Sequence, residues 1–498
     1  MKKYLTCLTF MFVIFFLNTI NVQAFSSSDY YNKDLCGTYE VAGFHADGVI
    51  DPVACYGTYE EAKQFMTENG ADDLAIMTKV NGATRIVDAN VALLDLSVSP
   101  QALTYFYRDA NLSSDTYTYM DTGSLYGGVD GYLLQTVINS NGVWVGKVLT
   151  GGCSAWISYE NYEIVPITWI KSSSSYTVTN ESIRHNYVAK IQEEYYKSAG
   201  STIGPKPDML DVGTYYSFDG HYFYKDLTTM IKDYRSDTRA NSVNNSNPYY
   251  NYYMFLSTHT KTSYSSANID EYIRDNMGIK QDVYGNASNG SNSRLYGKGV
   301  FYYYAQEKYG VNAILSLSLS RNETGNGRSN LAINKNNGFG LNAVDSNPYY
   351  AANQYASYAS SILGFASKWV TYGYARPYDW RYFGPQFGDK MNGMNVKYAS
   401  DTYWSEKMAA NYYSFDRAKG LQDYNYYQLG ILNYNQDAYS GPTTNSRRLY
   451  NYPEAGDAVV IVGEEQGDNY NGSNIWYKVV SDLNIDSSYN EITSGDYN

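Results

Sequence analysis

The strongest limit on the fold comes from an apolar segment, residues 301–323, that ends in a glutamate and runs directly into a glycine- and asparagine-rich loop. Its length predicts a helix, although the "ILSLSLS" part alternates as a strand does. In a helix, Leu315, Leu319 and Glu323 share one face. The acid would then lie at the carboxyl end of the helix, on its apolar side.

Such a position changes the chemistry of Glu323. Burial and the negative end of the helix dipole both disfavour the carboxylate, so both raise the pKa. A carboxyl group that is still protonated near neutral pH can protonate the leaving oxygen of a glycoside. The alternative is an ordinary glutamate at the rim of a helix.

The residues after Glu323 resemble a sugar-binding loop. Gly325 and Gly327 allow a sharp turn and a close approach of backbone to a ligand. Phe339 and Gly340 place a ring beside bare backbone. Side-chain amides that could bind sugar hydroxyl and acetamido groups come from Asn330, Asn334, Asn336 and Asn337. The alternative role of these amides is to satisfy the backbone of the loop itself.

This stretch resembles the signature of the endo-β-N-acetylglucosaminidases of glycoside hydrolase family 73. The pattern Glu-Ser-Gly-Trp-Gly-x-Ser, then Ala, Asn-Asn and Phe-Gly, is matched by Glu323, Gly325, Gly327, Ser329, Ala332, Asn336, Asn337, Phe339 and Gly340. A second family block is matched by Tyr398, Ala399, Ser400 and Asp401. A helix capped by Ser400 or Asp401 is expected to follow this block, and the residues that it should turn inward are Trp404, Met408, Tyr412 and Phe415. The resemblance covers residues from about 295 to 430.

The resemblance implies a lysozyme-like, mainly helical fold with Glu323 as general acid and Tyr398 beside the reacting sugar. It also implies substrate contacts from Gly325, Asn326, Asn336, Asn337 and Phe339. Asn326 stands where the family usually has tryptophan, which removes an aromatic platform. Candidates for a second carboxylate are Asp345, Asp379, Asp389 and Asp401, and the acetamido oxygen of the substrate could serve instead.

The amino terminus predicts export. Lys2 and Lys3 precede an apolar run, and Val22-Gln23-Ala24 is a small-x-small cleavage site, so residues 1–24 resemble a signal peptide. A membrane anchor is the alternative. Cleavage would leave Cys36, Cys55 and Cys153, which permit one disulfide and a free thiol, or no pairing.

Composition excludes several function classes. The net charge of −13 argues against nucleic acid or anionic membranes as partners. The chain has only 4 scattered histidines, so we expect no metal and no cofactor. The expected partner is the glycan strand of peptidoglycan; the sequence leaves the oligomeric state open.

The chain reads as a multidomain protein: a mainly α, lysozyme-like (α+β) catalytic domain between β-rich flanking modules. We expect an α/β module of unknown role at 25–195, with a capped helix at 59–69 and hairpins turning at Asn81-Gly82 and Asn141-Gly142. The catalytic domain is expected at 200–435 and a linker at 436–447. The tail holds two predicted strands, "DAVVIVGEE" and "NIWYKVV". Residues 448–498 resemble part of a bacterial Src-homology-3-like wall-binding module.

Together these features predict a secreted, wall-associated hydrolase that cuts the β-1,4 bond after N-acetylglucosamine in peptidoglycan. The alternatives are a glycan-binding protein on a hydrolase fold, and an endoglycosidase acting on glycoproteins. If the flanking modules only bind wall, a fragment of residues 200–440 should cleave short soluble glycans nearly as fast as the whole chain.

Overall fold

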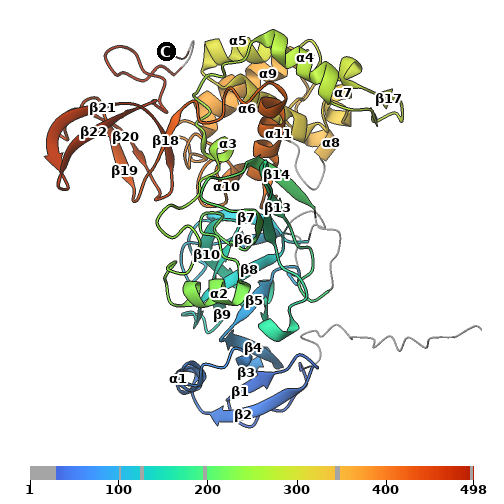
Figure 1. Cartoon of the computed structure of the whole chain (residues 1–498), viewed down its shortest axis with the longest axis vertical. Helices are drawn as coiled ribbons and strands as arrows, with labels where there is room; N and C mark the ends of the chain where they lie inside the picture. The colour runs from blue at the N-terminus through green and yellow to red at the C-terminus, as the bar shows by residue number, and fades with distance from the viewer. Residues whose placement is uncertain are drawn as a thin grey trace, which may run out of the picture.

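The computed structural model describes residues 30–99, 103–123, 128–193, 199–342, 348–493 and 497. Three parts follow one another in space: a β region (residues 30–249), a helical domain (252–419) and a C-terminal β unit (428–493) (Figure 1). The predicted signal peptide lies outside the described residues. Within the described ranges, no helix is both long and apolar enough to cross a membrane.

The β region begins with a four-stranded sheet of order β2-β1-β3-β4. Its strands are β1 (Tyr39–Phe44), β2 (Ile50–Tyr56), β3 (Leu74–Val80) and β4 (Ala83–Ala89), and helix α1 (Tyr59–Asn69) packs beside them. Thr58 and Glu61 form the predicted capping box, and Gly70 ends the helix with a φ of 73°. The predicted Asn81-Gly82 hairpin is also confirmed, with both turn residues at positive φ.

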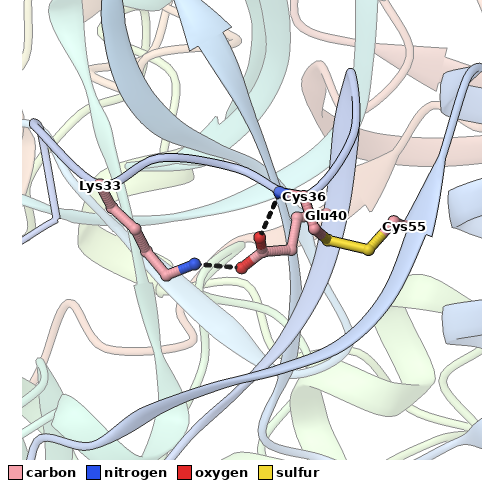
Figure 2. Close-up of a disulfide and its surroundings, with 4 residues drawn as sticks. All are labelled: Lys33, Cys36, Glu40 and Cys55. Atoms are coloured by element: carbon pink, nitrogen blue, oxygen red, sulfur yellow. Dashed lines mark hydrogen bonds and ion pairs between the residues drawn. A yellow bond between two sulfur atoms is a disulfide. The ribbon is translucent and has the colours of Figure 1, made fainter.

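A disulfide between Cys36 and Cys55 ties the start of the β region to strand β2 (Figure 2). Beside it, Glu40 accepts hydrogen bonds from the backbone N–H of Cys36 at 3.0 Å and from the ammonium of Lys33. Cys153 is a buried free thiol. Of the two arrangements that the sequence allowed, the structure has one disulfide and one free cysteine.

A second sheet has the order β10-β9-β8-β5-β11. It contains β5 (Ala92–Asp95), β8 (Asp130–Ile138), β9 (Trp144–Thr150), β10 (Cys153–Ser158) and β11 (Glu163–Pro166). Strands β8 and β9 form the hairpin predicted at Asn141-Gly142. A separate hairpin, β6 (Leu103–Phe106) with β7 (Thr118–Asp121), reaches toward the helical domain.

A third sheet corrects the predicted boundary between residues 195 and 200. It has the order β14-β13-β12-β15, with β12 (Ser175–Val178), β13 (Ser182–Asn186), β14 (Gly200–Pro205) and β15 (Gly213–Tyr215). The sheet therefore spans the predicted boundary. Helix α2 (Leu227–Arg235) also buries its apolar face in the β region. The core of the helical domain begins only at Tyr252.

The helical domain surrounds a single core. Its helices are α3 (Tyr252–Phe255), α4 (Ser266–Asn276), α5 (Gly299–Tyr309), α6 (Ala313–Glu323), α7 (Asn330–Lys335), α8 (Pro348–Ala351), α9 (Tyr358–Gly364), the π-helical η5 (Phe365–Tyr374), α10 (Asn395–Tyr398) and α11 (Trp404–Ala418). A small hairpin joins β16 (Lys280–Gln281) and β17 (Ala287–Ser288). The helix predicted over 301–323 is two helices, because Gly310 adopts a φ of 62° and ends α5.

The C-terminal unit begins before the predicted position. Strand β18 (Gln428–Ile431) pairs with β21 (Ala458–Tyr470), which pairs with β22 (Ser473–Val479). Strand β19 (Gln436–Tyr439) pairs with β20 (Arg448–Tyr452). Part of the predicted linker at 436–447 is thus a strand. The backbone N–H and C=O groups of its polar residues find their hydrogen-bond partners by pairing with β20. The strands predicted in the tail are confirmed as β21 and β22, and the resemblance to a Src-homology-3-like module stays a prediction.

Candidate active site

Helix α6 carries Glu323 as its last residue. The side-chain oxygen of Asn312 caps the helix by accepting from the backbone N–H groups of Ile314 and Leu315. Every residue from Ala313 to Arg321 is buried, whereas Glu323 keeps partial exposure. The helix is thus anchored in the core along its length, and its end presents the acid at the surface of that core.

Two donors and one glycine surround the Glu323 carboxyl. Its Oε1 accepts a hydrogen bond from the indole Nε1 of Trp404 at 2.9 Å and a longer one, 3.4 Å, from Asn322. A Cβ at Gly340, whose φ is 64°, would lie 3.0 Å from Oε2. Glycine at this position therefore lets the loop pass close to the acid without covering it.

Burial raises the pKa of Glu323 above its ordinary value. The hydrogen bonds from Trp404 and Asn322 oppose this rise because they stabilise the ionised form. Among nearby charges, the carboxylate of Asp401 raises the pKa and the ammonium of Lys407 lowers it. The pKa of Glu323 is thus raised, as the sequence predicted, and burial is the principal cause.

The turn after Glu323 is built from left-handed backbone. Gly325, Asn326 and Gly327 have φ values of 54°, 62° and 77°. Asn326 Oδ1 accepts a hydrogen bond from Arg321 Nε at 3.0 Å, and its backbone N–H donates to the Arg321 carbonyl at 2.8 Å. The asparagine thus stabilises a turn that suits few other residues. Its amide oxygen is used within the protein.

The predicted sugar ligands in the following loop are turned inward. Asn337 is fully buried; its amide donates to the carbonyls of Leu341 and Asn353 and accepts from the N–H groups of Phe339 and Leu341. Asn336 caps α7 and donates to the Tyr355 carbonyl. The Phe339 ring is 1% exposed. The structure therefore corrects the prediction for these side chains, because packing and loop hydrogen bonds already occupy them.

Tyr398 lies near Glu323, and Trp404 contacts both residues. Its ring stacks on Trp404 with centroids 4.8 Å apart, and its hydroxyl donates to the Phe339 carbonyl at 2.9 Å. Burial, followed by the charge of Glu323, holds the pKa of Tyr398 well above its ordinary value. A neutral phenol that remains partly exposed can still accept a hydrogen bond from a ligand.

The four candidates for a second carboxylate differ in surroundings. Asp345 lies outside the described residues. Asp379 forms a bidentate pair with Arg381 at 2.7 and 2.8 Å, which lowers its pKa. Asp389 is buried and borders a cavity of about 40 Å³ whose lining includes His185, His221 and Glu406 but not Glu323. Asp401 pairs with Lys407 and is the candidate whose charge acts on Glu323.

Trp404 is the site residue that the sequence analysis missed. The sequence predicted only that Trp404, Met408, Tyr412 and Phe415 face the core, and all four are buried. Nothing local in the sequence pairs an indole with an acid 81 positions earlier. The predicted cap also differs, since α11 starts after Tyr403, whose N–H donates to Asp401 at 3.0 Å.

The described residues contain no group of three or more His, Cys, Asp and Glu side chains arranged to hold a metal ion. A half-buried carboxyl with a raised pKa, beside a neutral phenol, is suited to donating a proton to a ligand oxygen.

Residues 300–417 match the family model described as glucosaminidase, mannosyl-glycoprotein endo-beta-N-acetylglucosaminidase. This match confirms the resemblance seen in the sequence. Two curated proteins of Streptococcus pneumoniae, from strains TIGR4 and R6, are each named "Putative endo-beta-N-acetylglucosaminidase". Each is 28% identical over 330 residues, which is 59% of this chain and 45% or 42% of the relative. The chain thus spans less than half the length of these curated relatives.

Among solved structures, autolysin E of S. aureus is 23% identical, with 34% of this chain and 72% of that chain covered and a TM-score of 0.25. Its complexes with the disaccharide NAG-NAM and with the muropeptide NAM-L-ALA-D-iGLU give the same identity, with 34% and 73% covered and a TM-score of 0.24.

Proposed function

We propose that this chain, which carries a glucosaminidase domain at residues 300–417, is a secreted peptidoglycan hydrolase. It cleaves the β-1,4 bond on the reducing side of N-acetylglucosamine. The observation that supports this most directly is Glu323, a half-buried acid whose pKa is raised by burial and whose carboxyl is held by the Trp404 indole. The signal peptide predicted at residues 1–24 supports export.

In the proposed reaction Glu323 is the general acid. It protonates the oxygen of the leaving sugar as the glycosidic bond breaks, and later removes a proton from the attacking water. The hydrogen bond from Trp404 fixes the direction of the carboxyl, and it stabilises the carboxylate that remains after the proton has left. Tyr398 lies where it can support the reacting sugar or its acetamido group. The oxygen that stabilises the sugar cation comes from Asp401 or from that acetamido group.

The test is a digest of purified cell wall with the full chain, followed by borohydride reduction and mass spectrometry of the soluble muropeptides. We expect reduced N-acetylglucosamine at the new chain ends. Glu323→Gln should lower the rate by at least about a hundredfold, as removal of a general acid does. Glu307→Gln is the matched control, because Glu307 lies on the exposed surface of α5, forms an ion pair with Lys261 and accepts a 3.4 Å hydrogen bond from Gln306. Reduced N-acetylmuramic acid, or equal rates for both variants, would contradict the proposal.

A second candidate is hydrolysis of glycoproteins, favoured by the description of the matched family. A high-mannose glycoprotein incubated under the same conditions distinguishes the two substrates. Release of its glycan in the absence of wall digestion would support the second candidate. Failure on both substrates, with retained binding to wall, would indicate a binding protein.

A further inference from the structure

Lys390 is a fully buried lysine at the junction of the β region and the helical domain. Its exposed fraction is 0%. Burial lowers the pKa of its ammonium to about 7, although Asp401, Cys153 and Asp389 act in the opposite direction. Within the described residues no ion pair joins this ammonium to a carboxylate. Because burying a charge is costly, its bonding partners show what the residue does.

Those partners are three backbone carbonyls from both parts of the protein. Lys390 Nζ donates to Tyr119 O of strand β7 at 3.1 Å, to Asn395 O at 3.0 Å, and to Ala399 O. The last two belong to the short segment that contains Tyr398. The ammonium thus links strand β7 to both ends of this segment, which is otherwise a single helical turn.

Further bonds from the same hairpin reach the same segment. The Asp121 N–H donates to Ser400 O at 2.8 Å, and Thr118 Oγ1 donates to Val396 O at 2.8 Å. Lys397 Nζ donates to Thr116 O at 2.6 Å. A helix of four residues such as α10 is too short to be stable by itself in water. The bonds from the β6–β7 hairpin therefore provide its external support.

We propose that Lys390 is a positioning residue, through which the β6–β7 hairpin fixes the segment 395–401 and so places Tyr398 and Asp401 beside Glu323. The effect on turnover rests on the proposed function. The β region is then part of the catalytic unit. A fragment of residues 200–440 lacks Tyr119, so it should cleave even short soluble glycans much more slowly than the whole chain. This reverses the expectation drawn from the sequence.

The first test uses full-length variants on a short soluble glycan. Lys390→Met keeps the apolar stem and removes the donors. We expect kcat to fall at least about tenfold with KM within about twofold, the pattern of a misplaced catalytic group. In a Tyr398→Phe background, Lys390→Met should lower kcat by a factor at least about threefold smaller than in wild type. The reason is that the effects of two substitutions are not additive when one residue acts through the other. Equal costs in both backgrounds, or a rate within about twofold of wild type, would overturn the proposal.

The matched control is Thr104→Val. It removes the 3.0 Å hydroxyl contact between Thr104 and Thr122 in the same hairpin, where neither hydroxyl bonds the segment 395–401. This variant should keep wild-type kcat. If Lys390→Met does not fold, Thr118→Val carries the test, because it removes one bond to Val396 without leaving a buried charge. It should lower kcat in the same direction, and an unchanged kcat would overturn the proposal.

A second measurement does not depend on activity. Hydrogen exchange followed by mass spectrometry should show faster exchange across 395–403 in Lys390→Met, with the amides of α6 unchanged. If wild type hydrolyses no glycan, the proposed function fails while this measurement still decides the role of Lys390. Unchanged exchange at 395–403 would overturn the positioning role.

Discussion

The indole Nε1 of Trp404 donates a hydrogen bond to Glu323 Oε1 at 2.9 Å, joining the first residue of α11 to the last residue of α6. Trp404 also stacks on Tyr398, so one buried side chain contacts both principal site residues. Its bond favours ionised Glu323, whereas burial favours the protonated acid. These are the two largest of the effects that act on the pKa of Glu323, and they oppose each other.

Trp404→Phe should shift the pH dependence of hydrolysis. Phenylalanine preserves much of the stack on Tyr398 but cannot donate to Glu323, so the ionised carboxyl loses stabilisation and its pKa rises further. A general acid must be protonated to act, and the alkaline limb of kcat/KM should therefore move to higher pH. The measurement is a pH profile for both proteins. A limb that moves to lower pH would contradict the assigned role of the indole.

Asp401→Asn should shift that limb in the opposite direction. The variant removes a negative charge that raises the pKa of Glu323, and it releases Lys407, whose positive charge lowers it. Both changes move the limb to lower pH. If the acetamido group of the substrate stabilises the sugar cation, we expect the rate at the optimum to stay within about tenfold of wild type. A loss of a thousandfold or so, as when an essential catalytic group is removed, would instead identify Asp401 as the second carboxylate.

Tyr398→Phe tests whether the hydroxyl works on the substrate. The structure shows one bond for it, to the Phe339 carbonyl, so its loss should cost about 1 kcal/mol of stability. If the hydroxyl also supports the reacting sugar, kcat should fall at least about tenfold, well beyond that structural cost. Thermal melting and steady-state kinetics on the same preparation separate the two effects. If the loss of activity is no larger than the loss of stability accounts for, Tyr398 has only a structural role in the core.

Local sequence rules predicted several elements correctly. The capping box at Thr58 and Glu61 and the Asn81-Gly82 hairpin depend on residues within one or two turns of each other, so neighbours in sequence specify them. The burial of Trp404 and Met408 also followed from helical spacing. The resemblance located Glu323 because the motif around it is contiguous.

The remaining features depend on contacts between distant residues. No short pattern shows that Asn337 and Phe339 fill the loop interior, because their partners include Asn353 and Phe365. The bond from Lys390 to Tyr119 spans 271 positions. Strand β14 likewise pairs with β13 across the predicted domain boundary. Composition alone could not have revealed that the β region completes the catalytic unit.

The C-terminal unit should respond to pH through Asp482. This carboxyl is 2% exposed and accepts a hydrogen bond from the Tyr382 hydroxyl at 2.7 Å. Burial raises its pKa to about 8. Between about pH 4 and pH 8 the folded protein therefore holds a proton that the unfolded chain has released, and the free energy of unfolding falls as pH rises through this range.

Asp482→Asn should remove that dependence, because asparagine resembles the protonated acid and stays neutral. We expect the variant to be more stable than wild type at pH 8, by about 1–3 kcal/mol, with the difference disappearing near pH 4. Thermal unfolding at pH 4 to 8 measures this. Asp468→Asn is the control, because Asp468 is an exposed residue of the same unit. A variant that is equally or less stable at pH 8 would show that Asp482 is ionised in the folded protein at that pH.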